Sequence, residues 1–502
     1  MQPRNRRSTR KFEHLSPFVL SAKRSKDAHD KLGPRAPADA HAFGRIPSLI
    51  ALTIAPKHNP RAMNNVLRRD FLRSGLGTAA ALTAGARTAR ASSATEAAIE
   101  IAHAEIWRRL IDRHGIMLDF SELDGSVAIP EPDECRLGKP NALGWWSPIE
   151  NGAFFNGLYM DAAVGRWRAT GAAPDAQKAR RLAQGLMLLA SVGSVKGFVG
   201  RGFATDGRAH YPMGSDDQTL PWFYGLWRFL DSGIAAKEEK ASIAAKLVEV
   251  ADEIVRRKWE LPAEDPFRTR GSFSGFLFYQ APRLLFVAKL IHKITGDPKW
   301  DAIYQTALRE RGGEGNRSRL ELCERGMVYD HGHGGRRHSW TTSNCVAAMR
   351  ALWELEEDRA IRAALFAGLQ ASATVAMESL PIALKFDNDA EPHFESDWRK
   401  LNASWVPQAS AREAQDLAEA QSRELRKLSP RRGQELSFVR EPVFAAWIAT
   451  LAPDKDSLQQ READLLHVLG HYRYDRLRYS QFFPAEAAWW RLMERRRGTK
   501  SG

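Results

Sequence analysis

Apolar residues recur at spacings of three and four along the chain from residue 95 to its end. Such spacing places apolar side chains along one face of an α-helix, and the alternating β-branched runs that favour strands are almost absent. Mostly short turns marked by Gly and Pro join the helical segments, and no long linker divides them. The pattern predicts one large all-α domain of about a dozen helices. The clearest helical segments are 174–192, 236–258, 283–295, 345–357, 359–380 and 457–471.

Four stretches break the helical pattern. Each is long and polar and contains scattered aromatic residues. Long loops in a compact domain are more often functional than accidental. We therefore predict functional loops around 119–148, 260–275, 312–342 and 385–410.

A recurring unit underlies the helical pattern. A Gly-containing, polar and aromatic stretch leads into an apolar helix, and an amphipathic helix follows it. The stretches differ too much in sequence for a solenoid of fixed period. Their recurrence is typical of helical hairpins arranged in a ring, with inner helices that begin at loops on one rim. We call these stretches the helix-start segments: 145–157, 214–225, 270–282, 331–344, 432–447 and 479–490.

The positive charge of the chain is concentrated at its N-terminus. The formal net charge of +14 is of the kind that nucleic-acid-binding proteins carry. Residues 1–91 hold 18 Lys and Arg against 5 Asp and Glu, whereas residues 92–502 hold 56 against 55. The balanced second part gives no electrostatic reason to expect a nucleic-acid partner.

Residues 63–91 have the order of an export signal. The paired arginines of LRRDFLR (67–73) precede a weakly apolar run at 75–86 and the small-residue motif ARA at 89–91. Charged, apolar and cleavable regions follow one another in this order in secretory signals, and the paired arginines resemble the twin-arginine (Tat) type. The apolar run is too short to be a stable membrane anchor. We therefore predict export through the Tat machinery to the periplasm or the medium.

The predicted signal divides the chain. Met63 stands five residues before the paired arginines, where such signals begin, and residues 1–62 show no clear periodicity. We predict that 1–62 is a disordered extension ahead of the true start. The mature protein then begins near Ser92, and residues 92–502 form a single domain.

The three cysteines indicate neither a disulfide framework nor a zinc site. Cys135, Cys323 and Cys345 are far apart, odd in number and without C-x-x-C spacing. One disulfide could form after export, but the sequence does not predict a pairing. We expect no cofactor and no metal.

The tryptophans are placed as a carbohydrate site requires. Sugars have apolar ring faces and hydroxyl rims, so their sites combine aromatic platforms with carboxylates, amides and arginines. Many of the 15 Trp lie in or beside the helix-start segments, although Trp227 and Trp447 have the spacing of core residues. We expect the substrate-binding residues of this group to include Trp145, Trp146, Asn151, His210 and Trp222.

Candidate catalytic carboxylates stand at two helix starts. Cleavage of a glycosidic bond needs a proton donor and a second carboxylate that activates water or attacks carbon. Asp216 and Asp217 occur together in GSDDQTLPWFYGLW (214–227), and Glu150 occurs in SPIENG. A helix cap requires only one carboxylate. We expect Asp216 to cap the helix and Asp217 to act as general acid and base, helped by Glu150 or Asp216.

A Gly-rich basic loop forms a second cluster, DHGHGGRRHSWTTSN (330–344). Its H-x-H motif beside an Asp could bind a divalent metal, its arginines could hold a carboxylate, and a histidine could act as the base of a lyase. No distant ligand completes a metal site, so substrate binding is favoured. The residues expected to bind substrate here are His331, His333, Arg336, His338 and Trp340.

The architecture and loop chemistry resemble those of a known superfamily. About 400 residues with a dozen helices, and Trp- and Asp-rich loops before alternate helices, are similar to the (α/α)6 toroid of six-hairpin glycosidases. The nearest likeness is to unsaturated glucuronyl hydrolase-type enzymes and covers most of residues 95–495. This resemblance implies an Asp that protonates a vinyl-ether double bond and then activates water. Asp217 is the nominee, although no position matches the pattern of that family closely.

The sequence therefore favours an exported glycoside hydrolase that acts on an acidic or substituted oligosaccharide. A polysaccharide lyase on the same fold, with His331, His333 or a Tyr as base, is the first alternative. A non-catalytic carbohydrate-binding scaffold is the second. The expected partners are the carbohydrate and the export machinery, and the oligomeric state stays open.

Overall fold

The structure is a computed structural model that describes residues 92–328 and 338–498. All of these residues belong to the unit Leu72–Gly502. The predicted extension (1–62) and export signal (63–91) lie outside the described residues, as do His331, His333 and Arg336.

The fold is predominantly helical, with 64% helix and 4% strand, which confirms the all-α class. Residues 92–105 are helical and continue into the π-helix η1 (Ile106–Leu110). The α-helices that follow are α2 (Pro132–Leu137), α3 (Gly152–Thr170), α4 (Ala173–Leu189), α5 (Asp216–Asp231), α6 (Lys237–Arg256), α7 (Ala281–Thr295), α8 (Pro298–Arg309), α9 (Arg319–Arg325), α10 (Ser339–Leu355), α11 (Arg359–Met377), α12 (Ala411–Leu428), α13 (Pro430–Glu435), α14 (Glu441–Leu451), α15 (Lys455–His471) and α16 (Pro484–Gly498). The π-helix η5 (Leu436–Arg440) joins α13 to α14, and the 3-10 helices are η2 (Gly326–Val328), η3 (Leu380–Lys385), η4 (Trp398–Ser404) and η6 (Tyr474–Arg476).

The six helical segments expected from apolar spacing are confirmed as α4, α6, α7, α10, α11 and α15. The loops were less well predicted, because short elements interrupt all four of them, and η4 lies within 385–410. Two antiparallel hairpins pair β1 (Glu260–Pro262) with β2 (Thr269–Ser272) and β3 (Arg311–Gly312) with β4 (Arg317–Ser318). Helix α2 lies within the predicted loop 119–148, and α9 lies within 312–342.

A capping box explains why α9 forms inside a predicted loop. Ser318 accepts a hydrogen bond from the backbone N–H of Glu321, and the Glu321 carboxylate accepts one from the N–H of Ser318. These reciprocal bonds satisfy two N–H groups at a helix start that would otherwise lack partners. A short amphipathic helix is thereby stabilised without a long apolar pattern.

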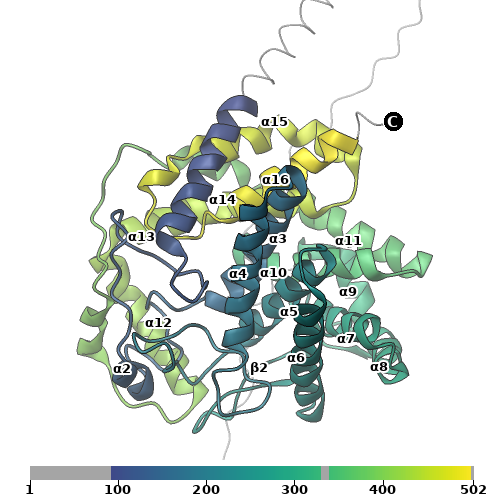
Figure 1. The fold of residues 1–502 in the computed structure, drawn as a ribbon, viewed down its shortest axis with the longest axis horizontal. Helices are drawn as coiled ribbons and strands as arrows, with labels where there is room; N and C mark the ends of the chain where they lie inside the picture. The colour runs from purple at the N-terminus through teal and green to yellow at the C-terminus, as the bar shows by residue number, and fades with distance from the viewer. Residues whose placement is uncertain (1–91, 329–337, 499–502) are drawn as a thin grey trace, which may run out of the picture. The chain divides into compact units, whose positions relative to one another are not determined.

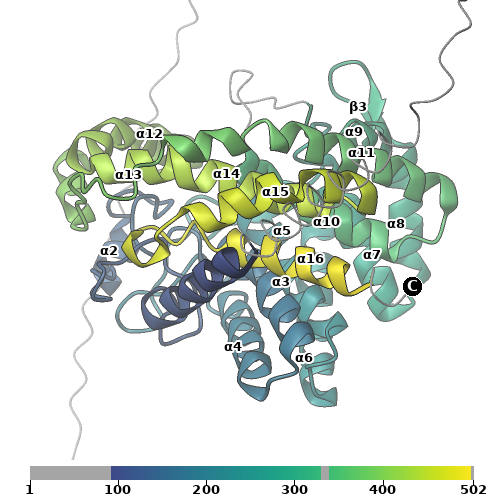
Figure 2. The ribbon, with the colours of Figure 1, turned by 90° about the horizontal axis from the view of Figure 1, so that it is seen from above.

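Six helices pack against one another, and further helices pack against these (Figures 1 and 2). Helix α3 packs against α5 and α16, α10 packs against α5, α7 and α14, and α14 packs against α16. Helices α4, α6, α8, α11 and α15 pack against these from outside. In both views α12 and α13 lie on the side of α2, away from α8.

Helices α3 and α5 approach closely because glycines face each other where they cross. A Cβ atom on Gly157 would lie 2.0 Å from the carbonyl oxygen of Pro221, and one on Gly225 would lie 2.6 Å from the Cα of Gly157. Only glycine allows this backbone separation. The close crossing brings the starts of the two helices near each other.

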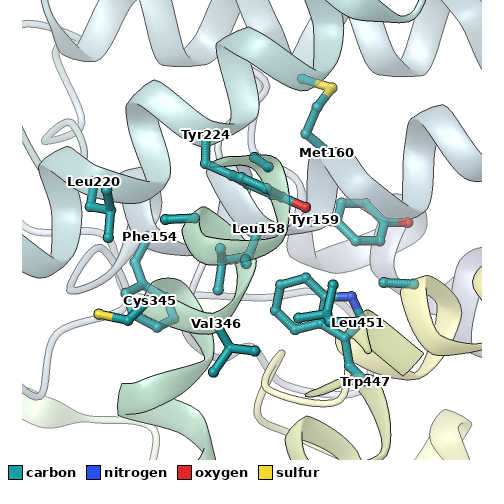
Figure 3. Close-up of a cluster of buried hydrophobic side chains, with 14 of the residues drawn as sticks. Phe154, Leu158, Tyr159, Met160, Leu220, Tyr224, Cys345, Val346, Trp447 and Leu451 are labelled. Carbon is teal, nitrogen blue, oxygen red and sulfur yellow. The ribbon is translucent and has the colours of Figure 1, made fainter. Parts of the chain in front are cut away.

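Aromatic and aliphatic side chains from four helices fill the centre of the molecule (Figure 3). Phe154 and Leu158 of α3 lie among side chains of α5, α10 and α14, including Leu220, Val346 and Trp447. Every residue of α3 from Gly152 to Val164 is buried. This part of the helix is therefore buried on all sides, as expected of an inner helix.

A buried ion-pair network ties α3 to its neighbours. Asp161 accepts hydrogen bonds from Arg491 (2.5 and 2.7 Å) and from the indole N–H of Trp447 (3.0 Å), and Arg228 lies 3.3 Å away. Burial alone would raise the pKa of Asp161, but Arg491 and Arg228 hold that pKa well below its usual value. Asp161 thus links α3, α5, α14 and α16.

One helical stretch, Arg359–Lys385, is long and apolar enough to cross a membrane by length and composition alone. It comprises α11 and η3 and packs against α9, α10 and α14. Buried core helices pass the same test, so the stretch does not identify a membrane span.

Candidate active site

One cavity, of about 330 Å³, gathers residues from five of the six helix-start segments. It lies at the N-terminal ends of α3, α5 and α10, where α12, α13 and η5 supply further lining residues. The segment 270–282 does not contribute. The residues that the sequence nominated and that line this cavity are Trp145, Trp146, Glu150, Asn151, Asp217, His338 and Trp340.

Three cavities are larger, of about 380, 440 and 580 Å³, and the charged groups in two of them already have partners. One, of about 440 Å³, contains His210 and Glu264, which are bonded to each other at 2.9 Å. The other, of about 580 Å³, is lined by four arginines that are each paired with a carboxylate, namely Arg431, Arg473, Arg476 and Arg478. Because these charges already have partners, neither cavity presents groups that need a ligand.

Glu150 stands directly before α3 and is partly exposed to the cavity. Its Oε2 accepts a hydrogen bond from the backbone N–H of Trp146 (2.7 Å). Burial raises the pKa of Glu150, and the positive charges of Arg432 and Arg201 only partly oppose this effect. The carboxyl group therefore keeps its proton to a higher pH than an exposed glutamate, as a general acid requires.

A buried carboxyl group, Asp119, lies close to Glu150, and the sequence pattern does not identify it as a site residue. It is 3% exposed, and its two oxygens accept hydrogen bonds from the backbone N–H (2.8 Å) and the side-chain Nδ2 (2.7 Å) of Asn151. Burial and the neighbouring charge of Glu150 raise the pKa of Asp119 well above its usual value. Asp119 lies in the predicted loop 119–148 but outside every helix-start segment, so only its contacts reveal it.

Asp217 lines the cavity, whereas Asp216 does not. The hydroxyl of Ser215 donates a hydrogen bond to Asp217 and accepts one from Arg201 (3.0 Å). The expectation for Asp216 is corrected: Ser215 is the N-cap residue of α5, and Asp216 is the first helical residue, ion-paired with the buried Arg283 of α7. This pairing explains Asp216 structurally and removes it from the candidate catalytic group.

Two tryptophans in the cavity carry arginines on their faces. The Arg432 guanidinium lies 4.5 Å from the ring centre of Trp146, and that of Arg440 lies 4.3 Å from the ring centre of Trp340. Trp146 has a φ of 74°, a left-handed conformation that is strained for a bulky residue. Such strain persists where the surroundings enforce it, as at binding sites.

Polar atoms at this cavity lack hydrogen-bond partners among the described residues. They include Nε of Arg440 and Oε1 of Gln481, and Gln481 is only 7% exposed. Burial lowers the pKa of Arg440 to about 9. The exposed Arg426 and the partly exposed Arg432 also line the cavity, and the charge of Arg432 acts on Glu150. Since buried polar atoms normally have partners, these groups are suited to an anionic, hydrogen-bonding ligand.

Two further nominated residues lie elsewhere, and the expectations for them are corrected. Trp222 is completely buried and donates its indole N–H to the carbonyl of Leu186 (2.8 Å), so it is a core residue. His210 lines the separate 440 Å³ cavity. The remaining nominees, His331, His333 and Arg336, lie outside the described residues.

The three cysteines form no disulfide within the described residues. Cys135, Cys323 and Cys345 are all buried and unpaired. Within residues 92–328 and 338–498, no group of three or more His, Cys, Asp or Glu side chains is placed to hold a metal ion.

No protein-family model, curated protein or solved structure matches this chain. The functional interpretation therefore depends on the cavity itself.

Proposed function

We propose that the protein is a glycoside hydrolase that acts on an acidic oligosaccharide bound in the 330 Å³ cavity. One observation carries the proposal: two carboxyl groups, Glu150 and Asp217, share the cavity with arginines stacked on Trp146 and Trp340. Aromatic faces suit sugar rings, unpaired guanidinium groups suit a carboxylate or sulfate, and paired carboxyl groups suit glycosidic cleavage.

The helix packing supports an (α/α)6 toroid as the architecture. Contacts lead from α3 to α5, α10, α14 and α16 and return to α3, and α7 packs against α5 and α10. Helices that follow the inner ones in sequence pack outside them. In such a ring the inner helices would begin on one rim, as the shared cavity at the starts of α3, α5 and α10 suggests.

The two carboxyl groups have different surroundings, and these assign their roles. Glu150, whose pKa is raised by burial, is the proton donor to the leaving oxygen. Arg201 donates to the hydroxyl of Ser215, which directs the hydroxyl proton to Asp217. Asp217 accepts this hydrogen bond, and we assign it the role of the base that activates water.

Charge in the rest of the cavity would select and orient the substrate. Arg426, Arg432 and Arg440 come from α12, α13 and η5 and line the cavity. The starts of α3, α5 and α10 add the positive ends of their helix dipoles. An acidic sugar is therefore favoured over a neutral one.

The test is an assay with unsaturated uronate disaccharides, whose ultraviolet absorbance is lost after hydrolysis. We expect turnover by the wild-type protein and a fall of about 10²–10⁴-fold for Glu150→Gln and for Asp217→Asn. Glu260→Gln and Asp464→Asn, at exposed positions, are the matched controls. Full activity of either cavity variant would overturn the assignment.

The same assay separates the alternatives. His338 lines the cavity and keeps a lyase open. A lyase would increase the absorbance when it acts on an intact uronate polymer. A scaffold would bind the sugar without any change in absorbance.

A further inference from the structure

We infer that Asp119 is a positioning residue of this site: it holds Asn151 and, through Asn151 and Gln218, fixes the two segments that carry Glu150 and Asp217. The inference rests on the proposed function for its catalytic consequence. The hydrogen bonds that carry it do not depend on the identity of the substrate.

The backbone of Asp119 already joins two segments of the cavity. Its N–H donates to the carbonyl of Pro148 (2.8 Å), two residues before Glu150. Its carbonyl accepts from the N–H of Ser480 (2.9 Å), one residue before Gln481. Asp119 therefore lies between the segment that leads into α3 and the segment that leads into α16.

The side chain extends this connection to α5. Both carboxyl oxygens of Asp119 are used by Asn151, whose own Oδ1 accepts from Nε2 of Gln218 (3.1 Å). Oε1 of Gln218 accepts in turn from the N–H of Phe154 (3.0 Å), in the first turn of α3. Asp119, Asn151 and Gln218 are all buried. The chain of bonds connects the residues next to Glu150 and Asp217 without contribution from solvent.

An aspartate is required at this position because Asn151 presents two N–H donors. A carboxylate accepts both, whereas an asparagine offers one acceptor oxygen and an NH₂ group that cannot accept. Asp119→Asn has nearly the same shape but loses one of the two bonds. It is therefore a minimal test of the connection.

The charges around the pair also couple Asp119 to Glu150. The charges of Glu150 and Arg201 shift the pKa of Asp119. Glu150 itself interacts electrostatically with Arg432, Arg201, Arg440 and Tyr479. Two carboxyl groups at one buried site do not both ionise readily, so the pair retains one proton to higher pH than a single group would. Removal of the Asp119 charge should lower the pKa of Glu150.

The experiment compares Asp119→Asn with a matched control, Asp112→Asn. Asp112 likewise accepts two hydrogen bonds, at 2.8 Å each, in its case from the backbone N–H groups of His114 and Ile116, but it lines a different cavity. With an unsaturated uronate disaccharide as probe, we expect kcat of Asp119→Asn to fall at least about tenfold, with KM changed by less than about twofold. The alkaline limb of its pH profile should move about one pH unit lower. Asp112→Asn should change neither.

A measurement without turnover separates this inference from the proposed function. Unfolding free energies are measured for Asp119→Asn, Gln218→Ala and the double variant. A double variant that loses less than the sum of the single losses supports the connected chain. Additive losses, or an unchanged kcat and pH profile in a protein that turns over the probe, would overturn the positioning role. If the wild-type protein does not act on the probe, the proposed function fails, and the unfolding cycle still decides the connection.

Discussion

Adjacent residues at the start of α5 have different partners because successive side chains on a helix point about 100° apart. Asp217 faces the cavity, and Asp216 faces Arg283 of α7. Trp222, five positions after Asp217, is turned by about 140° and faces the carbonyl of Leu186 in α4. The direction of each side chain, more than its chemistry, decides which residues serve the site.

Arg432 tests the selectivity of the cavity. Arg432→Ala removes a guanidinium group that lies on Trp146 without a hydrogen-bonded carboxylate among the described residues. A charge-assisted hydrogen bond to the substrate would be lost, so we expect KM for an acidic disaccharide to rise about 10–100-fold. KM for a neutral disaccharide should hardly change.

The control for this variant is Arg412→Ala, which removes an exposed arginine paired with Asp416 on α12. Steady-state kinetics on both sugars give the comparison. Equal changes in KM for the acidic and the neutral sugar in Arg432→Ala would show that this arginine does not select the substrate by its charge.

His210 and Glu264 predict a pH window for stability. Burial lowers the pKa of His210, but Glu264 and the carbonyl of Arg208 raise it overall, above the ordinary 6.5. Burial raises the pKa of Glu264, but His210 and Ser194 lower it overall, below the ordinary 4.5. The stability that His210 contributes is fully present below the pKa of this histidine in the unfolded chain and is lost as pH rises through its pKa in the folded protein. The stability that Glu264 contributes is fully present above the pKa of this glutamate in the unfolded chain and is lost as pH falls through its pKa in the folded protein.

Thermal unfolding of His210→Gln across pH checks this window. The wild-type protein should exceed the variant in stability most clearly between about pH 4.5 and pH 6.5, and the difference should shrink towards pH 8. A difference that is constant from pH 4.5 to pH 8 would contradict the ion pair.

The sequence identified the cavity-lining residues that stand at helix starts, but it did not identify the loop residue Asp119. Glu150, Asn151 and Asp217 stand in short polar stretches before apolar helices, and this pattern is visible in one chain. Asp119 belongs to the predicted loop 119–148, whose path depends on contacts with Pro148 at its other end and with Ser480, which is far away in the sequence. Arg432 begins a helix-start segment, but an arginine is most often a solvated surface residue, so the sequence pattern alone does not identify it as a site residue.

At the scale of helices, glycine placement determines how close α3 and α5 come. Apolar spacing gives the existence of both helices, but it does not give their separation. Gly157 and Gly225 recur at the ends of the aromatic stretches FFNG and WFYG, and their meeting at the crossing is apparent only in three dimensions. The crossing brings the starts of α3 and α5 to the same cavity.

Gly157→Ala tests this crossing. The added Cβ would lie 2.0 Å from a backbone carbonyl, which cannot move as a side chain can. We expect a loss of about 2–3 kcal/mol in unfolding free energy. Gly433→Ala, where a Cβ meets nothing within 4 Å, should be neutral or slightly stabilising. Chemical denaturation provides the measurement, and an unaffected Gly157→Ala protein would contradict the close approach.

At the scale of the whole molecule, buried charge links helices that are distant in sequence. Asp161 of α3 contacts Arg228 of α5, Trp447 of α14 and Arg491 of α16. A helical pattern read from the sequence cannot indicate which helices meet, because periodicity defines the buried face of each helix and not its partner. The all-α class was therefore predictable, and the order of packing was not.

Asp161→Asn tests the importance of this link. The substitution leaves the buried Arg491 without its ion-paired carboxylate and Arg228 with Glu354 alone, so we expect a loss of about 3–5 kcal/mol in unfolding free energy. The exposed pair of Asp231 and Arg168 provides a control, since Asp231→Asn should cost less than about 1 kcal/mol. Similar losses in the two variants would mean that Asp161 does not hold the helices together.

The most direct measurement is a crystal structure of Glu150→Gln with an unsaturated uronate disaccharide. We expect the sugar in the 330 Å³ cavity, with its carboxylate at Arg432 and Arg440 and its glycosidic oxygen within hydrogen-bond distance of residue 150. A sugar bound at another surface, or a carboxylate turned away from these arginines, would contradict the proposed site.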